Sequence, residues 1–112
     1  MNGWVPPLLD WPEAQSAISI IAGKWTSLIF AELGKGPQGY NMLVRATSLN
    51  TKTLNRYLRS MEDAGLVKRQ LRSERPLRVT YSLTSSAQAL LGLLSDLARW
   101  KEELNEDRRS HD

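Results

Sequence analysis

Polar and basic side chains that could contact a nucleic acid recur between residues 50 and 83 of this 112-residue chain. Five of them lie close together: Lys52, Thr53, Asn55, Arg56 and Arg59. Three arginines follow in the next segment: Arg72, Arg75 and Arg78. Arginine can bind guanine through two parallel hydrogen bonds, asparagine can bind adenine in the same way, and Lys and Arg neutralise phosphates. The residue types and their spacing therefore favour contact with the bases and the backbone of DNA.

The positive charge of the chain is concentrated in this region. Between Arg45 and Arg78, nine Lys and Arg side chains stand against three Asp and Glu side chains, which is a net charge of +6. The whole chain has a formal net charge of +3, so the other residues carry −3. Such a distribution is expected where one face meets a polyanion. The alternative is a merely solvated helix face, but that alternative must also explain the basic segment that follows.

The five polar residues are expected on one side of a helix over residues 50–64. At about 100° per residue, apolar residues fall on the opposite side: Leu54, Leu58 and Met61. Asn50 is a suitable N-cap for this helix, and Gly65 is a suitable stop. Tyr57 lies at the edge of the polar side, and two roles remain open for it: a phosphate contact, or a half-buried ring with its hydroxyl in water.

The three arginines belong to a predicted β-hairpin over residues 67–83. Apolar and polar residues alternate in VKRQL and again in LRVTYSL, and the polar turn SERP separates the two segments. At the tip of such a hairpin, the arginines would reach the flanking DNA backbone or a narrow minor groove, where the electrostatic potential is most negative.

Further helices are expected to hold this helix and hairpin in position. Three are predicted before them, over residues 12–22, from Lys24 to about Leu33, and over residues 40–46; Trp25 of the second is expected in the core. One is predicted after them, over residues 85–104, with a broad apolar stripe. An apolar arm and a disordered tail are expected at the two ends: residues 1–11 and 105–112.

This order of elements is typical of a winged helix-turn-helix domain, here over residues 12–104. The expected fold class is mainly α with a small β-hairpin, of the α+β type. In this domain the second helix of the motif lies in the major groove, with its N-terminal residues nearest the bases. The candidates for contacts with base edges or adjacent phosphates are Lys52, Thr53, Asn55 and Arg56. Arg59, one turn later, is a candidate for a phosphate contact.

Residues typical of one family of regulators occur in order along the chain. In the run AISIIAGKWTSLIFAELGKGPQGYNMLVRA they are Gly23-Lys24-Trp25, Leu33, Gly36-Pro37, Tyr40 and Leu43. After this run they are Lys52-Thr53-Leu54, Leu58, Glu62, Gly65-Leu66-Val67, Pro76, Val79, Tyr81 and Leu83-Thr84. On these residues the chain resembles the HxlR-type winged-helix transcription regulators, which are relatives of the MarR type. The resemblance covers about residues 10–104 and is specific in combination.

The resemblance implies a bacterial, cytoplasmic and nucleoid-associated regulator that binds palindromic operators as a homodimer. In such proteins the first and last helices form the dimer interface, and the response to an effector usually resides there. The sequence supports a dimer independently, because the last helix carries more apolar surface than a small core would absorb, with Trp100 as a suitable interface anchor. The alternative is that this helix packs only on its own domain.

Many members of this family carry a cysteine just before the first helix, where it senses oxidants or electrophiles. Here Trp11 stands at that place and the chain has no cysteine, which excludes thiol-based sensing. An aromatic or lipophilic small-molecule effector could instead bind an apolar pocket near the interface. The candidate residues for the interface or the pocket are Trp4, Trp11, Leu97, Trp100 and Leu104. Tryptophans that only seal the dimer are an equally good interpretation.

Other classes of function have little support in the sequence. An enzyme is not expected, because no convergent set of carboxylates, histidine and nucleophile is found, and no cofactor is expected. His111 lies in a polar tail without partners for a metal site. No apolar run has the length needed to cross a bilayer. The remaining alternative is a winged-helix protein–protein interaction module that does not bind DNA sequence-specifically.

Overall fold

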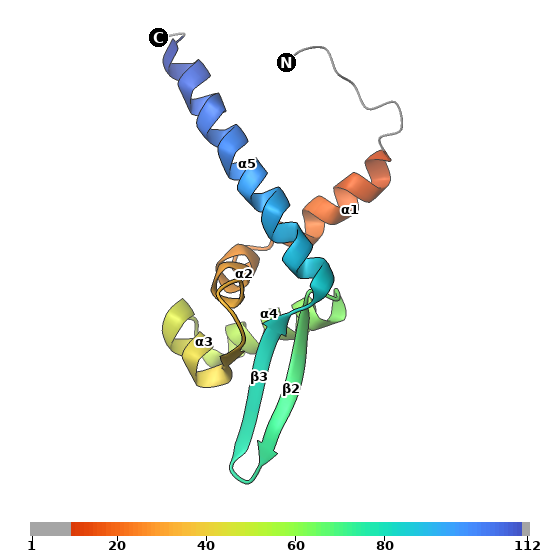
Figure 1. Cartoon of the computed structure of the whole chain (residues 1–112), viewed down its shortest axis with the longest axis vertical. Helices are drawn as coiled ribbons and strands as arrows, with labels where there is room; N and C mark the ends of the chain where they lie inside the picture. The colour runs from red at the N-terminus through yellow and green to blue at the C-terminus, as the bar shows by residue number, and fades with distance from the viewer. Residues whose placement is uncertain (1–9, 111–112) are drawn as a thin grey trace.

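In the computed structural model, residues 10–110 are described, and they form five helices and a small antiparallel sheet (Figure 1). The elements in chain order are α1 (Trp11–Ile21), α2 (Thr26–Leu33), β1 (Gln38–Gly39), α3 (Tyr40–Thr47), α4 (Thr51–Asp63), β2 (Val67–Glu74), β3 (Leu77–Leu83) and α5 (Ser85–Ser110). The predicted winged helix-turn-helix fold, mainly α with a small β-hairpin, is confirmed.

The apolar core lies where α2, α3 and α4 meet the base of the sheet. Its buried residues are Ile29, Phe30, Leu33, Leu43, Leu54, Leu58, Met61, Leu66, Val67, Tyr81, Leu83 and Ala87. The apolar side predicted for α4 is thus confirmed. Within the described residues, α1 contributes nothing to this core. The α5 helix contributes the buried Ala87, and its half-buried Leu90, Leu91 and Leu94 pack against the core. The first helix therefore lies outside the core, whereas the N-terminal half of the last helix packs on it.

The prediction that Trp25 belongs to the core is wrong. The α2 helix begins at Thr26, two residues after the predicted start at Lys24, and its buried residues are Thr26, Ile29, Phe30 and Leu33. Trp25 occupies the N-cap position and is only half-buried. The Nζ of Lys24 lies 4.9 Å from the centroid of its ring, at a distance typical of a cation–π contact.

The sheet has the order β1-β3-β2, and its first strand was not predicted. This strand has two residues, and it pairs with β3 through Gln38 opposite Tyr81 and Gly39 opposite Thr80. A two-residue strand has no alternation from which it could be predicted. It fixes the beginning of α3 against the hairpin.

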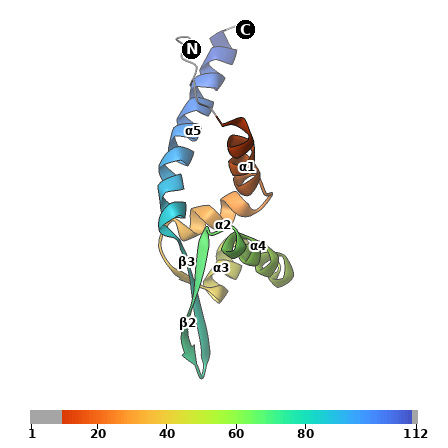
Figure 2. The same ribbon diagram turned by 90° about the vertical axis from the view of Figure 1, so that its right-hand side faces the viewer.

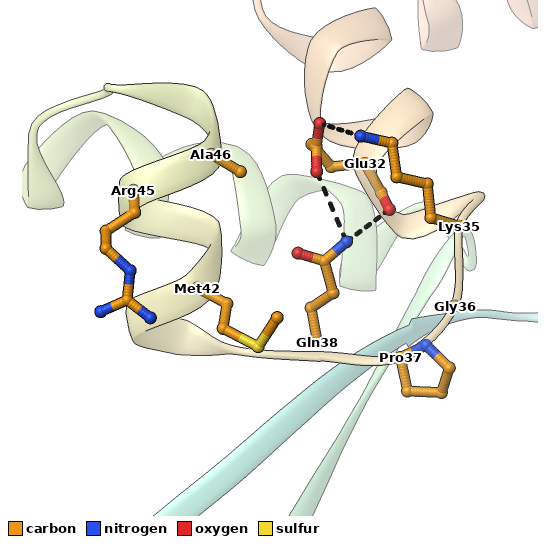
Figure 3. A pocket seen from close by; sticks show the side chains of 8 residues that line it. All are labelled: Glu32, Lys35, Gly36, Pro37, Gln38, Met42, Arg45 and Ala46. Atoms are coloured by element: carbon orange, nitrogen blue, oxygen red, sulfur yellow. Dashed lines mark hydrogen bonds and ion pairs between the residues drawn. The ribbon is translucent and has the colours of Figure 1, made fainter.

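A polar joint connects the end of α2 to β1 (Figure 3). The Nε2 of the buried Gln38 donates a hydrogen bond to the backbone oxygen of Glu32 at 2.6 Å. The Nζ of Lys35 lies 2.9 Å from Oε1 of Glu32. The hydrogen bond from Lys35, followed by that from Gln38 and the charge of Lys35, lowers the pKa of the Glu32 carboxyl, although desolvation opposes this shift.

Side chains close the ends of α4 and α5. As predicted, Asn50 caps α4, because its Oδ1 accepts a hydrogen bond from the backbone N–H of Thr53 at 2.8 Å. Gly65 follows α4 with a positive φ of 81°, which favours glycine. Thr84 caps α5: its Oγ1 accepts from the backbone N–H of Ala87 at 3.2 Å and donates to the backbone oxygen of Gly65 at 2.7 Å.

The ends of the helical part differ from the prediction. The α5 helix continues to Ser110, so the disordered tail predicted from residue 105 is wrong for residues 105–110. No glycine or proline interrupts this segment, and Arg108 and Arg109 favour the negative end of the helix dipole. At the other end, Trp11 starts α1 instead of ending the arm, because Asp10 caps that helix by accepting from the N–H of Glu13.

Candidate nucleic-acid interface

The α4 helix presents its predicted contact residues to solvent. Lys52, Asn55, Arg56 and Arg59 are exposed, and Thr53 is half-buried. The opposite side of the same helix supplies three core residues: Leu54, Leu58 and Met61. Because the core holds this side in place, the rotation of α4 about its axis is determined, and the polar side must face outward.

The charges on this surface are free to meet a ligand. Within the described part of the chain, the only ion pairs are Lys35 with Glu32 and Arg99 with Asp96. None of the predicted DNA-contact residues therefore has a carboxylate partner there. The guanidinium carbon of Arg56 lies 5.6 Å from the centroid of the half-buried Tyr57 ring. The half-buried ring agrees with one of the two roles considered for Tyr57, and the phosphate contact stays a prediction.

The hairpin of β2 and β3 forms a wing beside α4. Figure 1 shows the hairpin projecting beyond the helices, and Figure 2 shows α4 next to its base, while α1 and α5 lie toward the other end of the molecule. The chain passes from α4 into β2 through a short turn in which the N–H of Leu66 donates to the backbone oxygen of Met61. The helix and the wing therefore form one connected surface.

The three predicted wing arginines lie at different places. Arg75 lies in the two-residue connection at the tip, and Arg78 is exposed near the start of β3. Arg72 is not at the tip: it lies at an irregularity in β2, where the register shifts between Leu71 and Ser73. Its Nε donates to Oγ1 of Thr80 at 2.9 Å, and its Nη2 donates to Oε1 of Gln70 at 2.9 Å.

The start of α3 also belongs to this surface, although the sequence did not indicate it. A groove of about 370 Å³ lies between the wing and α3, and its lining includes Tyr40, Asn41 and Met42 together with Arg72 and Arg78. The hydroxyl of Tyr40 donates to the backbone oxygen of Thr51 at 3.4 Å, which links the two helices of the motif. Pairing of β1 with β3 brings these segments together, and no local pattern predicts that pairing.

Other hollows lie away from α4, among them the following two. One of about 550 Å³ adjoins the polar joint between α2 and β1. Met42 and Arg45 of α3 line it together with the Glu32–Lys35 pair (Figure 3). The other, of about 490 Å³, lies between α1 and α5 and is lined almost entirely by apolar residues, including Ile18, Ile21 and Leu97. This second hollow has the chemistry of an apolar binding site.

The residues predicted for the interface or effector pocket lie mainly on α1 and α5. Trp11, Leu97 and Trp100 are each more than half exposed, at 55%, 52% and 55%, and Leu104 is half-buried. Trp4 lies outside the described residues. Among residues 10–110, no group of three or more His, Cys, Asp and Glu side chains is placed to hold a metal ion.

A helix-turn-helix unit followed by a basic hairpin defines the winged helix-turn-helix class of DNA-binding proteins. Residues 20–109 match the HxlR-like helix-turn-helix family, and the chain belongs to this family.

Known proteins support this assignment. An HTH-type transcriptional regulator from Halalkalibacterium halodurans is 39% identical over 101 residues, which cover 88% of each chain. The crystal structure of a MarR-family regulator from Enterococcus faecalis is similar with a TM-score of 0.80 and 33% identity, over 96% of this chain and 97% of that one. The quinone-bound form of the regulator YodB from Bacillus subtilis is similar with a TM-score of 0.72 and 26% identity, over 82% of this chain and 97% of that one.

The chain is therefore a transcriptional regulator with a DNA-binding helix-turn-helix domain, and its family and relatives are regulators and not enzymes. In residues 10–110, no single helix has the length and hydropathy needed to cross a membrane. Helices α1 and α2 pass that test only when taken together, across a bend of 78°.

Proposed function

We propose that this chain binds a specific palindromic DNA site as a homodimer, with α4 in the major groove and the wing on the flanking backbone. One observation carries the proposal: the exposed side of α4 is basic and lacks carboxylate partners, while its opposite side is held in the core. A helix fixed in this way can present a constant set of donors and acceptors to base edges.

The position of each side chain along α4 suggests its role. The residues in its first two turns are proposed to contact base edges or adjacent phosphates: Lys52, Thr53, Asn55 and Arg56. Arg59 lies a turn further along and is proposed to bind a phosphate. Arg75 at the tip of the wing and Arg78 on β3 are proposed to neutralise the flanking backbone.

The apolar surface of α1 and α5 supports the homodimer. Six large apolar side chains on these two helices are exposed in a single chain: Trp11, Ile18, Ile20, Leu93, Leu97 and Trp100. An exposed apolar area of this kind marks an interaction site. A two-fold dimer suits a palindromic site, whose half-sites lie about one helical turn of DNA apart, about 34 Å.

The hollow between α1 and α5 supports a small-molecule effector that acts without a thiol. Its lining is apolar, so an aromatic or lipophilic compound is the expected ligand. The related regulator YodB has been crystallised with a quinone bound. A compound that binds between these helices would change the spacing of the two α4 helices and thereby the affinity for DNA. A nucleoid-associated location in the bacterial cytoplasm follows from the same proposal.

Selection of bound DNA from a random pool tests the proposal. The expected result is enrichment of an inverted repeat, whose affinity falls steeply with salt concentration because phosphate contacts release counterions. Repeating the selection with aromatic and lipophilic compounds tests the effector. Enrichment of no sequence, together with an affinity that does not depend on salt, would contradict the proposal and favour a protein–protein interaction module.

A further inference from the structure

The hydrogen bonds of Arg72 identify side chains that hold this arginine in place behind the proposed DNA-contact surface. We infer that Thr80 and Gln70 are positioning residues that hold the Arg72 guanidinium ready to bind one backbone phosphate. This inference rests on the DNA binding proposed above. The phosphate lies at the mouth of the groove between the wing and α3, at a place distinct from the tip where Arg75 lies.

The backbone of β2 directs Arg72 toward its two partners. Gln70 pairs directly with Thr80 across the hairpin, and Arg72 is the extra residue where the register shifts. Irregularities of this kind bend a strand and redirect a side chain. Arg72 consequently turns back along the strands to Thr80 and Gln70, although a regular strand would let it extend freely into solvent.

The two hydrogen bonds occupy one edge of the guanidinium. Nε and Nη2 form the side edge of the group, and both donate within the protein, at 2.9 Å each. A guanidinium has five N–H donors, so three remain, on Nη1 and Nη2 at its end. This end is a flat fork that matches two oxygens of a phosphate. The geometry thus leaves free the part of the group that binds phosphate best.

The groove that Arg72 lines suits an anionic ligand from outside the protein, because no carboxylate of the protein lines it. The groove that Arg72 lines also contains Arg78 and the exposed Asn41, and no acidic side chain is among its lining residues. Arg72 is exposed and has no ion pair within the described residues. A side chain already held in place loses less conformational entropy on binding than a free arginine, which strengthens the contact.

A double-mutant cycle tests the inference, with binding measured to a site selected from the random pool. Arg72→Ala is expected to weaken binding about 10-fold or more and to reduce the slope of log affinity against log salt by about 1. Thr80→Val keeps a β-branched residue in the strand and keeps the arginine charge. It is expected to weaken binding about 3-fold to 10-fold with an unchanged salt slope, since only the positioning is lost.

The cycle separates positioning from a direct contact. In the Arg72→Ala background, Thr80→Val is expected to have no further effect, because there is no guanidinium left to position. Thr80→Ser keeps the hydroxyl and is expected to retain wild-type affinity. Gln70 is exposed, so Gln70→Leu serves as a second variant that leaves the packing intact, and it is expected to behave like Thr80→Val.

The outcomes also separate this inference from the proposed function. If Thr80→Val weakens binding equally in both backgrounds, or leaves the affinity unchanged in the wild type, Thr80 does not position Arg72. In either case the DNA binding of the wild-type protein still stands. If the wild-type protein shows no salt-dependent binding to any selected sequence, the proposed function itself fails. Thermal unfolding of each variant verifies that the fold is retained.

Discussion

At the scale of single residues, function depends on which charged groups the protein leaves unpaired. The arginines of α4 and of the wing have no carboxylate partners within the described residues, whereas Lys35 is paired with Glu32. An unpaired guanidinium at the surface costs little in water and gains much on meeting a phosphate or a guanine. The individual arginines are expected to differ in what they contribute, because their positions differ.

Arg56 and Arg75 are expected to give different phenotypes when truncated. Arg56→Ala removes a candidate base contact, so discrimination at one position of the site should fall by about 1–3 kcal/mol. Arg75→Ala removes a contact with the backbone, so binding should weaken uniformly across sequences and the salt slope should fall by about 1. Affinities for a set of single-base variants of the selected site, measured at several salt concentrations, distinguish the two effects.

A charge-matched control for both variants lies on α5. Arg108 is exposed in the last turn of that helix. Figure 1 shows the C-terminal end of α5 remote from the wing. Arg108→Ala should leave both the affinity and the base preference unchanged. A profile of base preference that stays the same in Arg56→Ala would show that Arg56 does not contact a base.

At the scale of elements, α4 presents a constant polar side to solvent because both its ends and its buried side are fixed. The Asn50 cap begins the helix, Gly65 ends it, and the core residues determine its rotation. The wing is tied to the same unit through β1, whose pairing with β3 brings the start of α3 close to Thr80. The proposed contact surface is therefore made of α4, the wing and the start of α3. Each of them depends on the others for its position.

Loss of the α4 cap is expected to destabilise the protein and weaken its binding to DNA. Asn50→Ala removes the acceptor for the N–H of Thr53, at a cost of about 1 kcal/mol in the free energy of unfolding. Asn50→Asp keeps the acceptor, so stability should be retained while the added negative charge weakens DNA binding. Urea unfolding and DNA affinity, measured on both variants, test this. Equal stability of Asn50→Ala and the wild type would show that the cap does not stabilise α4.

The joint between α2 and β1 is expected to lose stability in acid. Lys35 and Gln38 lower the pKa of Glu32 in the folded protein below its ordinary value of 4.5. A carboxyl whose pKa is lowered on folding contributes stability that is present above its ordinary pKa and is lost as the pH falls through the lowered value. The stability advantage of the wild type over Glu32→Gln should therefore be present at pH 7 and disappear in acid. Urea unfolding of both proteins from pH 7 down to pH 3 measures it, and an advantage that does not change with pH would contradict it.

At the scale of the whole molecule, the surfaces proposed for DNA contact and for self-association lie at opposite ends. The wing and α4 lie at one end, and α1 and α5 lie toward the other (Figure 2). The chain is long and narrow, with extents of 59 × 34 × 22 Å. The α5 helix packs on the core through Ala87, Leu90, Leu91 and Leu94. The apolar side chains of α1 and α5 that remain exposed are available to a second copy.

A charge placed in the apolar face of α5 is expected to prevent dimer formation. Leu97 is 52% exposed in one chain, and Leu97→Glu would bring a buried, unpaired carboxylate into each half of a symmetric interface. Sedimentation should then give the 12.7 kDa mass of a single chain, whereas the wild type is expected to give twice that value. Affinity for the full palindrome should fall toward that for a half-site. Met42→Glu, at an equally exposed position outside α1 and α5, should leave the mass of the dimer unchanged. A wild type that sediments as a single chain at all concentrations would contradict the homodimer.

The sequence by itself determined the elements whose signals are local. The 3.6-residue period of Leu54, Leu58 and Met61, the cap at Asn50 and the alternation in the hairpin were all sufficient, because each arises from neighbours a few residues apart. The same reasoning wrongly predicted disorder directly after residue 104. There the absence of helix-breaking Gly and Pro was enough for α5 to continue to Ser110.

Only the tertiary structure decided how these elements share their surfaces. Three sets of contacts join residues that are distant in sequence or lie across the hairpin. They are the pairing of β1 with β3, the hydrogen bonds that hold Arg72 on Thr80 and Gln70, and the packing of α5 against the core. No periodicity encodes such contacts, because they depend on the packing of elements against one another and not on the order of residues within one element. The exposed basic side of α4 could thus be predicted from the chain, whereas the groove beside the wing required the fold.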